Sequence, residues 1–307
     1  MRPTVAGIGI SHPDRVLFPG LQATKLDLAR YYETVADWIL PHVVDRPLTL
    51  VRCPTGVRAK GAASAQSVDC FFMKHAKVWA PPSLRRVRIR EKTKLGEYLI
   101  ADSLAAIVGL AQMDVLEIHT WNSRFARLEQ PDRIVIDLDP GAEVGWPAVI
   151  EAARVTRQLL AAMDLESFVK TTGGRGLHVV VPLAPRADWS ECLEFARAVA
   201  DTLVRRAPEQ FTARFAKVGR ERKILVDYLR NNRTNTSVAA YSTRAKPDAP
   251  VSVPVAWSEL SPAKPPDRFT MATVAQRVAR LRADPWKSYW TTRQRIPHRA
   301  VGALERL

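Results

Sequence analysis

Cysteine is scarce in this sequence of 307 residues, and its spacing excludes several protein classes. Cys53, Cys70 and Cys192 lie far apart and form no Cys-x-x-Cys pair. Neither a disulfide framework nor a zinc ribbon is therefore expected. Three thiols buried in a core fit a protein of the reducing cytoplasm.

The sequence also lacks a long apolar run. Residues 1–9 have no apolar core of the kind that a signal peptide carries. The most apolar stretch, 98–118, is interrupted by Asp102, Gln112 and Asp114. We interpret it as a buried helix rather than a membrane span, and no membrane partner is expected.

Acidic residues are too few to balance the basic ones. The formal net charge is +15, the isoelectric point is about 10.2, and 47% of residues are apolar. The apolar content is enough for a sizeable core. The charge favours a polyanionic partner, most commonly nucleic acid, although a merely soluble basic protein would show it too.

Hydrophobic periodicity predicts alternating strands and helices, with no internal repeat. Strands are expected at 47–52, 84–94, 133–139, 167–171, 177–183 and 223–228, and helices at 26–40 (ended by Pro41), 147–163, 191–206 and 271–283. From residue 133 to residue 228 the predicted order is strand–helix–strand–turn–strand–helix–strand. This order predicts an α+β (mixed α/β) fold with a ferredoxin-like, RRM-like sheet. We expect an α/β accessory subdomain at 1–130, a catalytic subdomain at 131–256 and a basic tail with a helix at 257–307, all within one domain.

Two carboxylates stand two residues apart on a predicted strand. Asp137 and Asp139 share one face of that strand, while the residues between them point into the core. Carboxylates held together in this way favour hard cations such as Mg²⁺ or Mn²⁺. Asp227 lies in a second apolar strand and needs a partner, either a shared metal or Arg230. An Asp-x-Asp pair also occurs in glycosyltransferases and nucleases.

A glycine-rich turn joins two predicted strands at 171–178. Glycines let backbone N–H groups approach a phosphate closely. Thr172 offers a hydroxyl, Arg175 a charge and His178 a ring donor, which together suit a triphosphate. The alternative is a tight hairpin turn with a solvated Arg175. The turn is not a Walker A loop, because the Lys-Ser/Thr pair is missing.

Other segments combine aromatic, histidine and basic side chains. Phe71 and Phe72 followed by Lys74 suit stacking on a base beside a phosphate contact, although two core phenylalanines are the alternative. His119 lies in a predicted strand, where a histidine is more often structural. In 84–94 the alternate residues form a basic stripe, which suits either nucleic acid or a charged edge strand.

Eight short segments resemble one family when they are taken in order. They are Ser11-His12-Pro13-Asp14-Arg15, Lys25-Leu26, Phe71-Phe72-Met73-Lys74-His75, His119-Thr120-Trp121-Asn122, Asp137-Leu138-Asp139-Pro140, Thr172-Gly173-Gly174-Arg175-Gly176-Leu177-His178, Val226-Asp227-Tyr228-Leu229-Arg230-Asn231 and Ala240-Tyr241-Ser242-Thr243-Arg244. Over about residues 8–260 this set is similar to the polymerase domain of bacterial DNA ligase D, of the archaeo-eukaryotic primase superfamily. The resemblance implies a primase-polymerase fold.

The resemblance also implies residue roles. Asp137, Asp139 and Asp227 would hold two ions, Mn²⁺ or Mg²⁺. The incoming nucleotide would meet His119, Thr172, His178 and Arg244, with Arg52, Arg175 and Arg230 as further candidates. Arg15 and Lys25 would grip a 5′-phosphate across a gap, and Phe71, Phe72 and Lys74 would contact DNA. Thr172 replaces a serine that is frequent in relatives but keeps the hydroxyl, and the long loop at 57–69 leaves the approach to Phe71 open.

The implied function is template-dependent addition of nucleotides, preferably ribonucleotides, to a primer 3′-hydroxyl during non-homologous end joining. Expected partners are DNA with a gap or a double-strand break, its 5′-phosphate, NTP or dNTP, a ligase and a Ku-type end-binding protein, in the bacterial cytoplasm at the nucleoid. No Lys-x-Asp-Gly ligase motif is present, so an excised module and a stand-alone polymerase both remain open. Alternatives are a gap-filling polymerase of base excision repair, a non-catalytic end-bridging module and an Asp-x-Asp nuclease.

Overall fold

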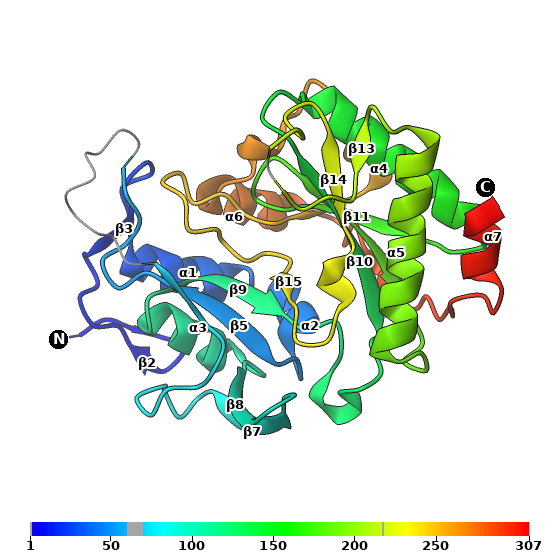
Figure 1. The fold of residues 1–307 in the computed structure, drawn as a ribbon. Coiled ribbons are helices and arrows are strands. Elements are labelled where there is room, and N and C mark those ends of the chain that lie inside the picture. The colour runs from blue at the N-terminus through cyan, green and yellow to red at the C-terminus, as the bar shows by residue number, and fades with distance from the viewer. Residues whose placement is uncertain (1, 60–69, 217, 307) are drawn as a thin grey trace. The chain divides into compact units, whose positions relative to one another are not determined.

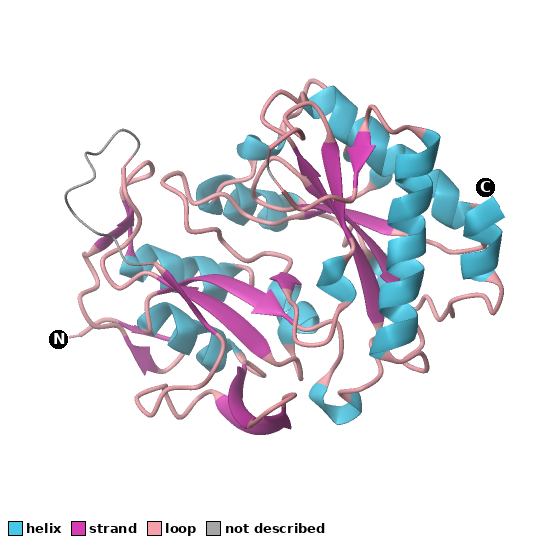
Figure 2. Ribbon diagram, viewed as in Figure 1, coloured by secondary structure: helices cyan, strands magenta, loops and turns pink. Residues whose placement is uncertain are grey.

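The computed structural model describes residues 2–59, 70–216 and 218–306 (Figures 1 and 2). Its backbone contacts divide the chain into two units. Unit 1 consists of Met1–Thr120, Val238–Val253 and Arg268–Leu281, and unit 2 consists of Trp121–Ser237, Pro254–Asp267 and Arg282–Leu307. We predicted a boundary near residue 130, whereas this division falls at 120/121 and returns two later segments to unit 1. The two later segments join unit 1 through pairing between residues that are far apart in the sequence, which periodicity does not reveal.

Unit 1 is built on a four-stranded sheet in the order β15-β9-β5-β6, with β5 antiparallel to both β9 and β6. Helix α1 packs against α3 and α6. Thr24 and Asp27 begin α1 with reciprocal side-chain-to-backbone bonds. Its elements are β1 (Thr4–Val5), β2 (Ile8–Gly9), β3 (Val16–Phe18), β4 (Ala23–Thr24), α1 (Lys25–Thr34), α2 (Ala36–Val43), β5 (Leu48–Arg52), β6 (Phe71–Met73), β7 (Arg85–Arg90), β8 (Leu95–Ile100), α3 (Leu104–Gln112), β9 (Val115–Thr120), β15 (Ser237–Val238) and α6 (Met271–Arg280).

Unit 2 is built on a six-stranded sheet in the order β13-β14-β10-β12-β11-β16. Its main strands and helices are β10 (Arg133–Pro140), α4 (Trp146–Ala161), β11 (Phe168–Thr171), β12 (Leu177–Pro182), α5 (Trp189–Arg206), β13 (Phe211–Thr212), β14 (Ile224–Asp227), β16 (Pro254–Val255) and α7 (Ala300–Arg306). In chain order the four central strands are β10, β11, β12 and β14, and their order in the sheet is β14-β10-β12-β11. The first strand, β10, therefore lies between the last, β14, and the third, β12. This confirms the predicted ferredoxin-like arrangement and the mixed α+β class.

The two faces of this sheet have different coverings. Ile134, Ile136 and Leu138 are fully buried, and α4 and α5 pack on β10 (Figure 1). Side chains alternate along a strand, so Val135 points to the opposite face together with Asp137 and Asp139. Short 3₁₀ turns complete the unit at Phe125–Arg127, Leu229–Asn231, Trp257–Glu259, Pro266–Arg268 and Lys287–Trp290.

The C-terminal tail covers part of that opposite face. Trp286 is 2% exposed, stacks on Tyr289 with ring centroids 4.9 Å apart, and packs with Phe168, Val135 and Val180. Its indole N–H donates to the Val169 carbonyl at 3.0 Å. Trp286 therefore packs in the core of unit 2 and satisfies its N–H there, as is usual for a buried tryptophan.

Two predicted helices differ from the observed ones. The helix expected at 26–40 breaks at Val35 into α1 and α2, and Pro41 lies inside α2, which runs to Val43. The apolar stretch 98–118 is the end of β8, then α3, then most of β9. Continuous apolarity cannot separate a buried helix from buried strands. In the described part of the chain, no helix is long and apolar enough to cross a membrane.

The cysteine prediction is wrong. Cys53 and Cys70 form a disulfide with Cα atoms 4.3 Å apart, and only Cys192 is a free thiol. The cause is strand register, since Arg52 on β5 pairs with Phe71 on β6 and the two flanking cysteines therefore meet. Their separation of 17 residues hides this neighbourhood in the sequence. The loop at 57–69 lies mostly outside the described residues.

Candidate active site

Strand register assembles the acidic residues of unit 2. On β10, Asp137 faces Asp227 of β14 on one side and His178 of β12 on the other. Asp137 and Asp227 are 7% and 8% exposed, whereas the Asp139 side chain is about half exposed. Residues distant in sequence thus form one carboxylate cluster on the uncovered end of the sheet face. The sequence predicted these three aspartates together, and their role as metal ligands stays a prediction.

Two arginines neutralise the cluster. Arg230 Nε lies 3.0 Å from Asp137 Oδ2 and 3.1 Å from Asp227 Oδ2. Arg220 Nη2 lies 3.2 Å from Asp139 Oδ2. Asn231 fixes the turn that carries Arg230, because its amide exchanges two hydrogen bonds of 2.8 Å with the backbone of Val135. Arg230, one of the two partners expected for Asp227, pairs with it, and Arg220 was not foreseen.

Burial and charge act in opposite directions on the carboxyl groups. Burial alone would raise the pKa of Asp137, but His178 and Arg230 hold that pKa well below its usual range. Burial raises the pKa of Asp227, and Arg230 offsets it only in part while the charge of Asp137 adds to it. The two carboxylates therefore need a cation between them to remain ionised together.

The donor set suits a divalent cation. Asp137 and Asp227 each direct an oxygen at the point that Arg230 Nε occupies, so the guanidinium stands where a cation would be held. Carboxylate oxygens are the ligands that Mg²⁺ and Mn²⁺ favour. Across residues 2–59, 70–216 and 218–306, no three His, Cys, Asp or Glu side chains already enclose a metal site. Arg230 would have to turn outward to admit an ion.

His178 and Lys170 extend the cluster along the sheet. His178 is 2% exposed, and its Nε2 lies 3.4 Å from Asp137 Oδ1. Burial, and then the charge of Lys170, lower the pKa of His178 to about 4, so the ring is neutral at pH 7. Lys170 is its register partner on β11 and is 4% exposed. Lys170 was not among the predicted site residues, although it alternates with Phe168 and Thr172 in the sequence.

The glycine-rich turn is held by its own bonds. The Thr172 hydroxyl donates to the Gly176 carbonyl at 3.1 Å and accepts from the Gly174 N–H at 3.2 Å. Gly173 adopts φ 67°, which favours glycine. Arg175 donates to the Val144 carbonyl at 2.7 Å. Protein hydrogen bonds thus fix the turn, and the nucleotide contacts assigned to Thr172 and Arg175 stay predictions.

In unit 1, one buried carboxylate links two of the nucleotide-contact candidates, His119 and Arg244. Glu117 Oε2 lies 2.8 Å from His119 Nε2 and 3.0 Å from Arg244 Nε. The Ala245 N–H donates to Glu117 Oε1 at 2.8 Å. Burial would raise the pKa of Glu117, but His119 and Arg244 lower it to about 2. His119 and Arg244 were predicted site residues, whereas Glu117, two residues before the histidine, was not.

A second carboxylate of unit 1 gathers the phosphate-site candidates. Asp114 forms an ion pair with Arg15, a second with Lys25 at 2.9 Å, and a third with Arg52 at 3.6 Å. The Arg52 Nε also donates to the Met113 carbonyl at 2.8 Å. Arg52, which was a nucleotide-contact candidate, therefore lies beside Arg15 and Lys25.

Aromatic side chains are exposed near the start of β6. Phe71, Phe72 and Trp79 are 40%, 72% and 52% exposed, although β6 itself pairs with β5. The Arg52 guanidinium lies 4.7 Å from the Trp79 ring centroid and 5.9 Å from that of Phe71. Lys74 Nζ pairs with Glu91 Oε1 at 3.1 Å. The alternative of core phenylalanines is excluded, and Trp79 joins a surface suited to stacking on bases.

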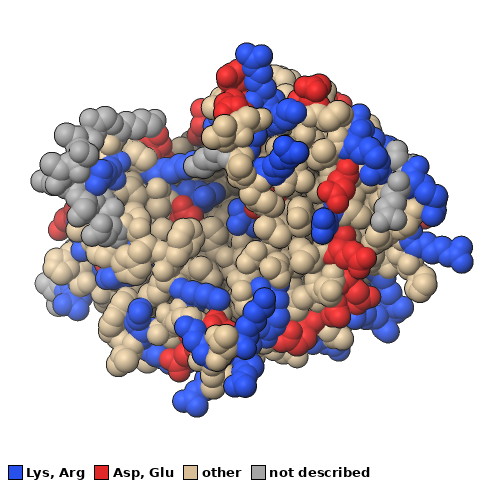
Figure 3. All heavy atoms as spheres, viewed as in Figure 1, with Lys and Arg blue, Asp and Glu red and all other residues tan. Residues whose placement is uncertain are grey.

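Part of the predicted basic stripe lies on β7, because the strand ends at Arg90 and residues 91–94 turn into β8 instead of continuing it. Arg86, Arg88 and Arg90 are exposed, while Val87 and Ile89 are buried. Arg86 is engaged by Glu97 and by backbone carbonyls. More widely, Lys and Arg side chains spread over the face shown in Figure 3, and Asp and Glu occupy a smaller part of it. These observations fit either nucleic-acid binding or a charged edge strand.

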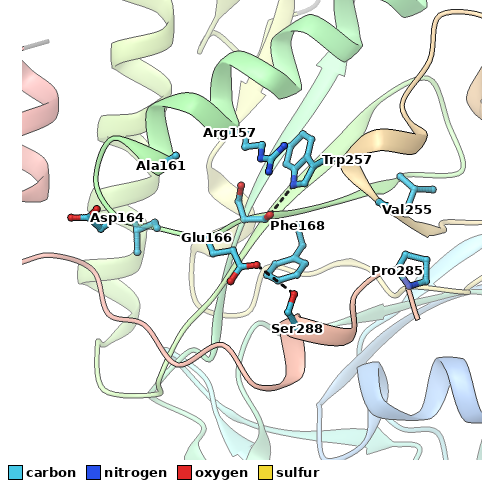
Figure 4. Close-up of a pocket in the computed structure, with 12 residues that line it drawn as sticks. Arg157, Ala161, Asp164, Glu166, Phe168, Val255, Trp257, Pro285 and Ser288 are labelled. Carbon is cyan, nitrogen blue, oxygen red and sulfur yellow. Dashed lines mark hydrogen bonds between the residues drawn. The ribbon is translucent and has the colours of Figure 1, made fainter. Parts of the chain in front are cut away.

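A cavity of about 420 Å³ in unit 2 offers a different chemistry (Figure 4). The Arg157 guanidinium lies over the Trp257 ring at 4.9 Å, and the indole N–H donates to the Ser167 carbonyl at 2.8 Å. Glu166 accepts hydrogen bonds from Ser288 and Thr292. Arg157 and Glu166 are engaged by neighbouring side chains, and the cavity adjoins the start of β11 rather than the end that leads to Thr172. The carboxylate cluster is the stronger candidate.

Known proteins resemble this chain over most of its length. A family described as "LigD, primase-polymerase domain" matches residues 24–286. The multifunctional non-homologous end joining protein LigD of Pseudomonas aeruginosa is 40% identical over 296 residues, which is 96% of this chain and 34% of that protein. The bifunctional protein LigD of Bacillus subtilis is 27% identical over 94% of this chain and 45% of its own length.

The fold is similar to a solved structure as well. The polymerase domain from Mycobacterium tuberculosis ligase D, in complex with DNA, matches with a TM-score of 0.83 and 31% identity, over 92% of this chain and 97% of that one. The chain thus spans one solved polymerase domain but only about a third of the Pseudomonas aeruginosa protein.

Proposed function

The chain belongs to the ligase D primase-polymerase family of metal-dependent nucleotidyltransferases, and on that premise we propose that it performs templated primer extension at gaps and broken ends in DNA end joining. The substrates are DNA and nucleoside triphosphates, with ribonucleotides preferred. The observation that carries the proposal is the opposition of Asp137 and Asp227 around one cation position, with His178 beside it.

Asp137, Asp139 and Asp227 hold two ions, Mn²⁺ or Mg²⁺, in this proposal. Bound there, the ions lower the pKa of the primer 3′-hydroxyl and neutralise the triphosphate. Arg230 leaves the position between the acids and, together with Lys170, remains close enough to balance phosphate charge. His178 contacts the incoming nucleotide in this proposal. Because its ring is neutral, it donates one hydrogen bond to the nucleotide without adding a charge that would repel the ions.

The remaining roles are assigned to individual side chains. Thr172, Arg175, His119 and Arg244 are the proposed contacts of the incoming nucleotide. Arg15 and Lys25 bind the 5′-phosphate across a gap, and Phe71, Phe72 and Lys74 support the template. The proposed setting is the bacterial cytoplasm at the nucleoid, with a ligase and a Ku-type end-binding protein completing the repair.

Primer extension on a gapped duplex with a 5′-phosphate tests the proposal, with ribo- and deoxyribonucleotides compared in Mn²⁺ and Mg²⁺. We expect templated addition favouring ribonucleotides, abolished by Asp137→Asn while duplex binding persists. Asp201→Asn, an exposed position on α5, is the matched control and should retain full extension. Binding without addition would favour an end-bridging module, and cleavage without nucleotides would favour a nuclease.

A further inference from the structure

Three cations of unit 1 share a single carboxylate partner. Asp114 contacts Arg15, Lys25 at 2.9 Å and Arg52 at 3.6 Å. The Asp114 and Lys25 side chains are 8% and 2% exposed, whereas those of Arg15 and Arg52 are 31% and 22% exposed. The cluster therefore has a buried base, Asp114 with Lys25, and two arginines that reach solvent.

The backbone fixes the position of this carboxylate. Asp114 lies in the turn between α3 and β9 with φ 62°, a conformation that residues other than glycine rarely adopt. Its carbonyl accepts from the Cys53 N–H at 2.9 Å, and its N–H donates to the Ala111 carbonyl at 3.0 Å. A left-handed residue bonded on both sides is a rigid support for the cations around it.

The charges of the cluster match a terminal phosphate. Three cations and one carboxylate leave a net charge of +2, and a phosphate monoester carries about −1.5 to −2 at neutral pH. Burial lowers the pKa of Lys25, and the hydrogen bond and charge of Asp114 act against that effect. The charges of Arg15 and Arg52 lower the same pKa, and the Ser11 hydroxyl lies 3.5 Å from Nζ. Asp114 is thus the group that favours the protonated form of Lys25.

We propose that Asp114 is the positioning residue of the 5′-phosphate site, which keeps Lys25 charged and holds Arg15 and Arg52 as the two arms that close on the phosphate. This inference rests on the proposed gap-filling function. It moves Arg52 from the nucleotide site to the 5′-phosphate site. The two exposed arginines donate hydrogen bonds to the phosphate. Lys25 stays buried and paired with Asp114, and its positive charge attracts the phosphate.

The test compares wild type, Asp114→Asn and Asp114→Glu on gaps that end in a 5′-phosphate or a 5′-hydroxyl, from pH 6 to 9. We expect Asp114→Asn to reduce the preference for the phosphorylated gap at least about tenfold, as expected for removal of one partner of a buried ion pair. The remaining preference should fall further as pH rises, because Lys25 then loses its proton. Extension at the hydroxyl gap should equal wild type, and Asp114→Glu should recover part of the preference.

The outcomes distinguish a failure of the proposed gap-filling function from a failure of the role inferred for Asp114. Asp37→Asn, at an exposed site on α2, is the control and should change neither substrate. A wild type that ignores the 5′-phosphate would remove the premise itself. A preference and pH profile unchanged in Asp114→Asn, with wild type discriminating, would overturn the inference alone. An equal loss on both gaps would also overturn it, because the role would then be structural; circular dichroism and duplex-binding anisotropy identify that case.

Discussion

Replacing Glu117 with glutamine removes the charge that holds His119 and Arg244 while keeping the size of the side chain. The side chain of Glu117 is 9% exposed and bonded to both residues, so solvent screens these contacts little. A pKa lowered from 4.5 to about 2 corresponds to about 3 kcal/mol in favour of the charged form, at about 1.4 kcal/mol per tenfold change in protonation. We expect the variant to lose about 2 to 3 kcal/mol of unfolding free energy at pH 7.

The loss should depend on pH with a defined sign. The pKa of Glu117 is lower in the folded chain than in the unfolded one, so its contribution is fully present above pH 4.5 and disappears as pH falls toward 2. The gap between wild type and variant should therefore narrow across this window. Urea unfolding at a series of pH values measures the gap, and nucleotide KM at neutral pH should rise because His119 and Arg244 lose their common anchor.

Glu129→Gln is the matched control for the stability measurement. Glu129 accepts two hydrogen bonds from Arg233 at 2.7 and 2.8 Å, but its side chain is 61% exposed. An exposed pair contributes at most about 1 kcal/mol, so this control should stay near wild type. A Glu117→Gln variant as stable as the control, or a stability gap that is constant with pH, would refute the reasoning from burial.

Three further changes have expected outcomes. Trp286→Ala should reduce the unfolding free energy by about 3 to 5 kcal/mol, because it leaves a cavity in the aromatic cluster that packs on the sheet. Calorimetry or urea unfolding measures this change, and a loss below about 1 kcal/mol would contradict that packing. Gly176→Ala would place a Cβ 2.3 Å from the Leu138 carbonyl oxygen, so β10 and β12 should separate at the acid cluster and extension activity should fall at least tenfold; wild-type activity would show that the backbone can adapt. Cys53→Ser should lower the melting temperature only under oxidising conditions, where the bond to Cys70 forms, and an equal difference after reduction would show that the thiol matters for packing alone.

Local sequence patterns predicted much of this fold, because the formation of a single strand or helix depends mainly on residues that are close together in the sequence. Short runs of β-branched and other apolar residues placed β10, β12 and β14 within one or two residues, and the order of strands and helices predicted the ferredoxin-like sheet of unit 2. Asp137 and Asp139 follow from the same alternation, which puts both on one face. Where the periodic signal was only continuous apolarity, as at 98–118, the prediction merged two strands and a helix.

By itself, therefore, the sequence determined the order of elements, the family resemblance and the identity of the main acids and bases, because these depend on residue type and short spacing. Only the tertiary structure decided which distant groups meet. Register between β5 and β6 joined Cys53 to Cys70, and the fold of unit 1 placed Asp114 among three cations drawn from separate segments. Such pairings depend on strand register and burial across long separations, which no local pattern encodes.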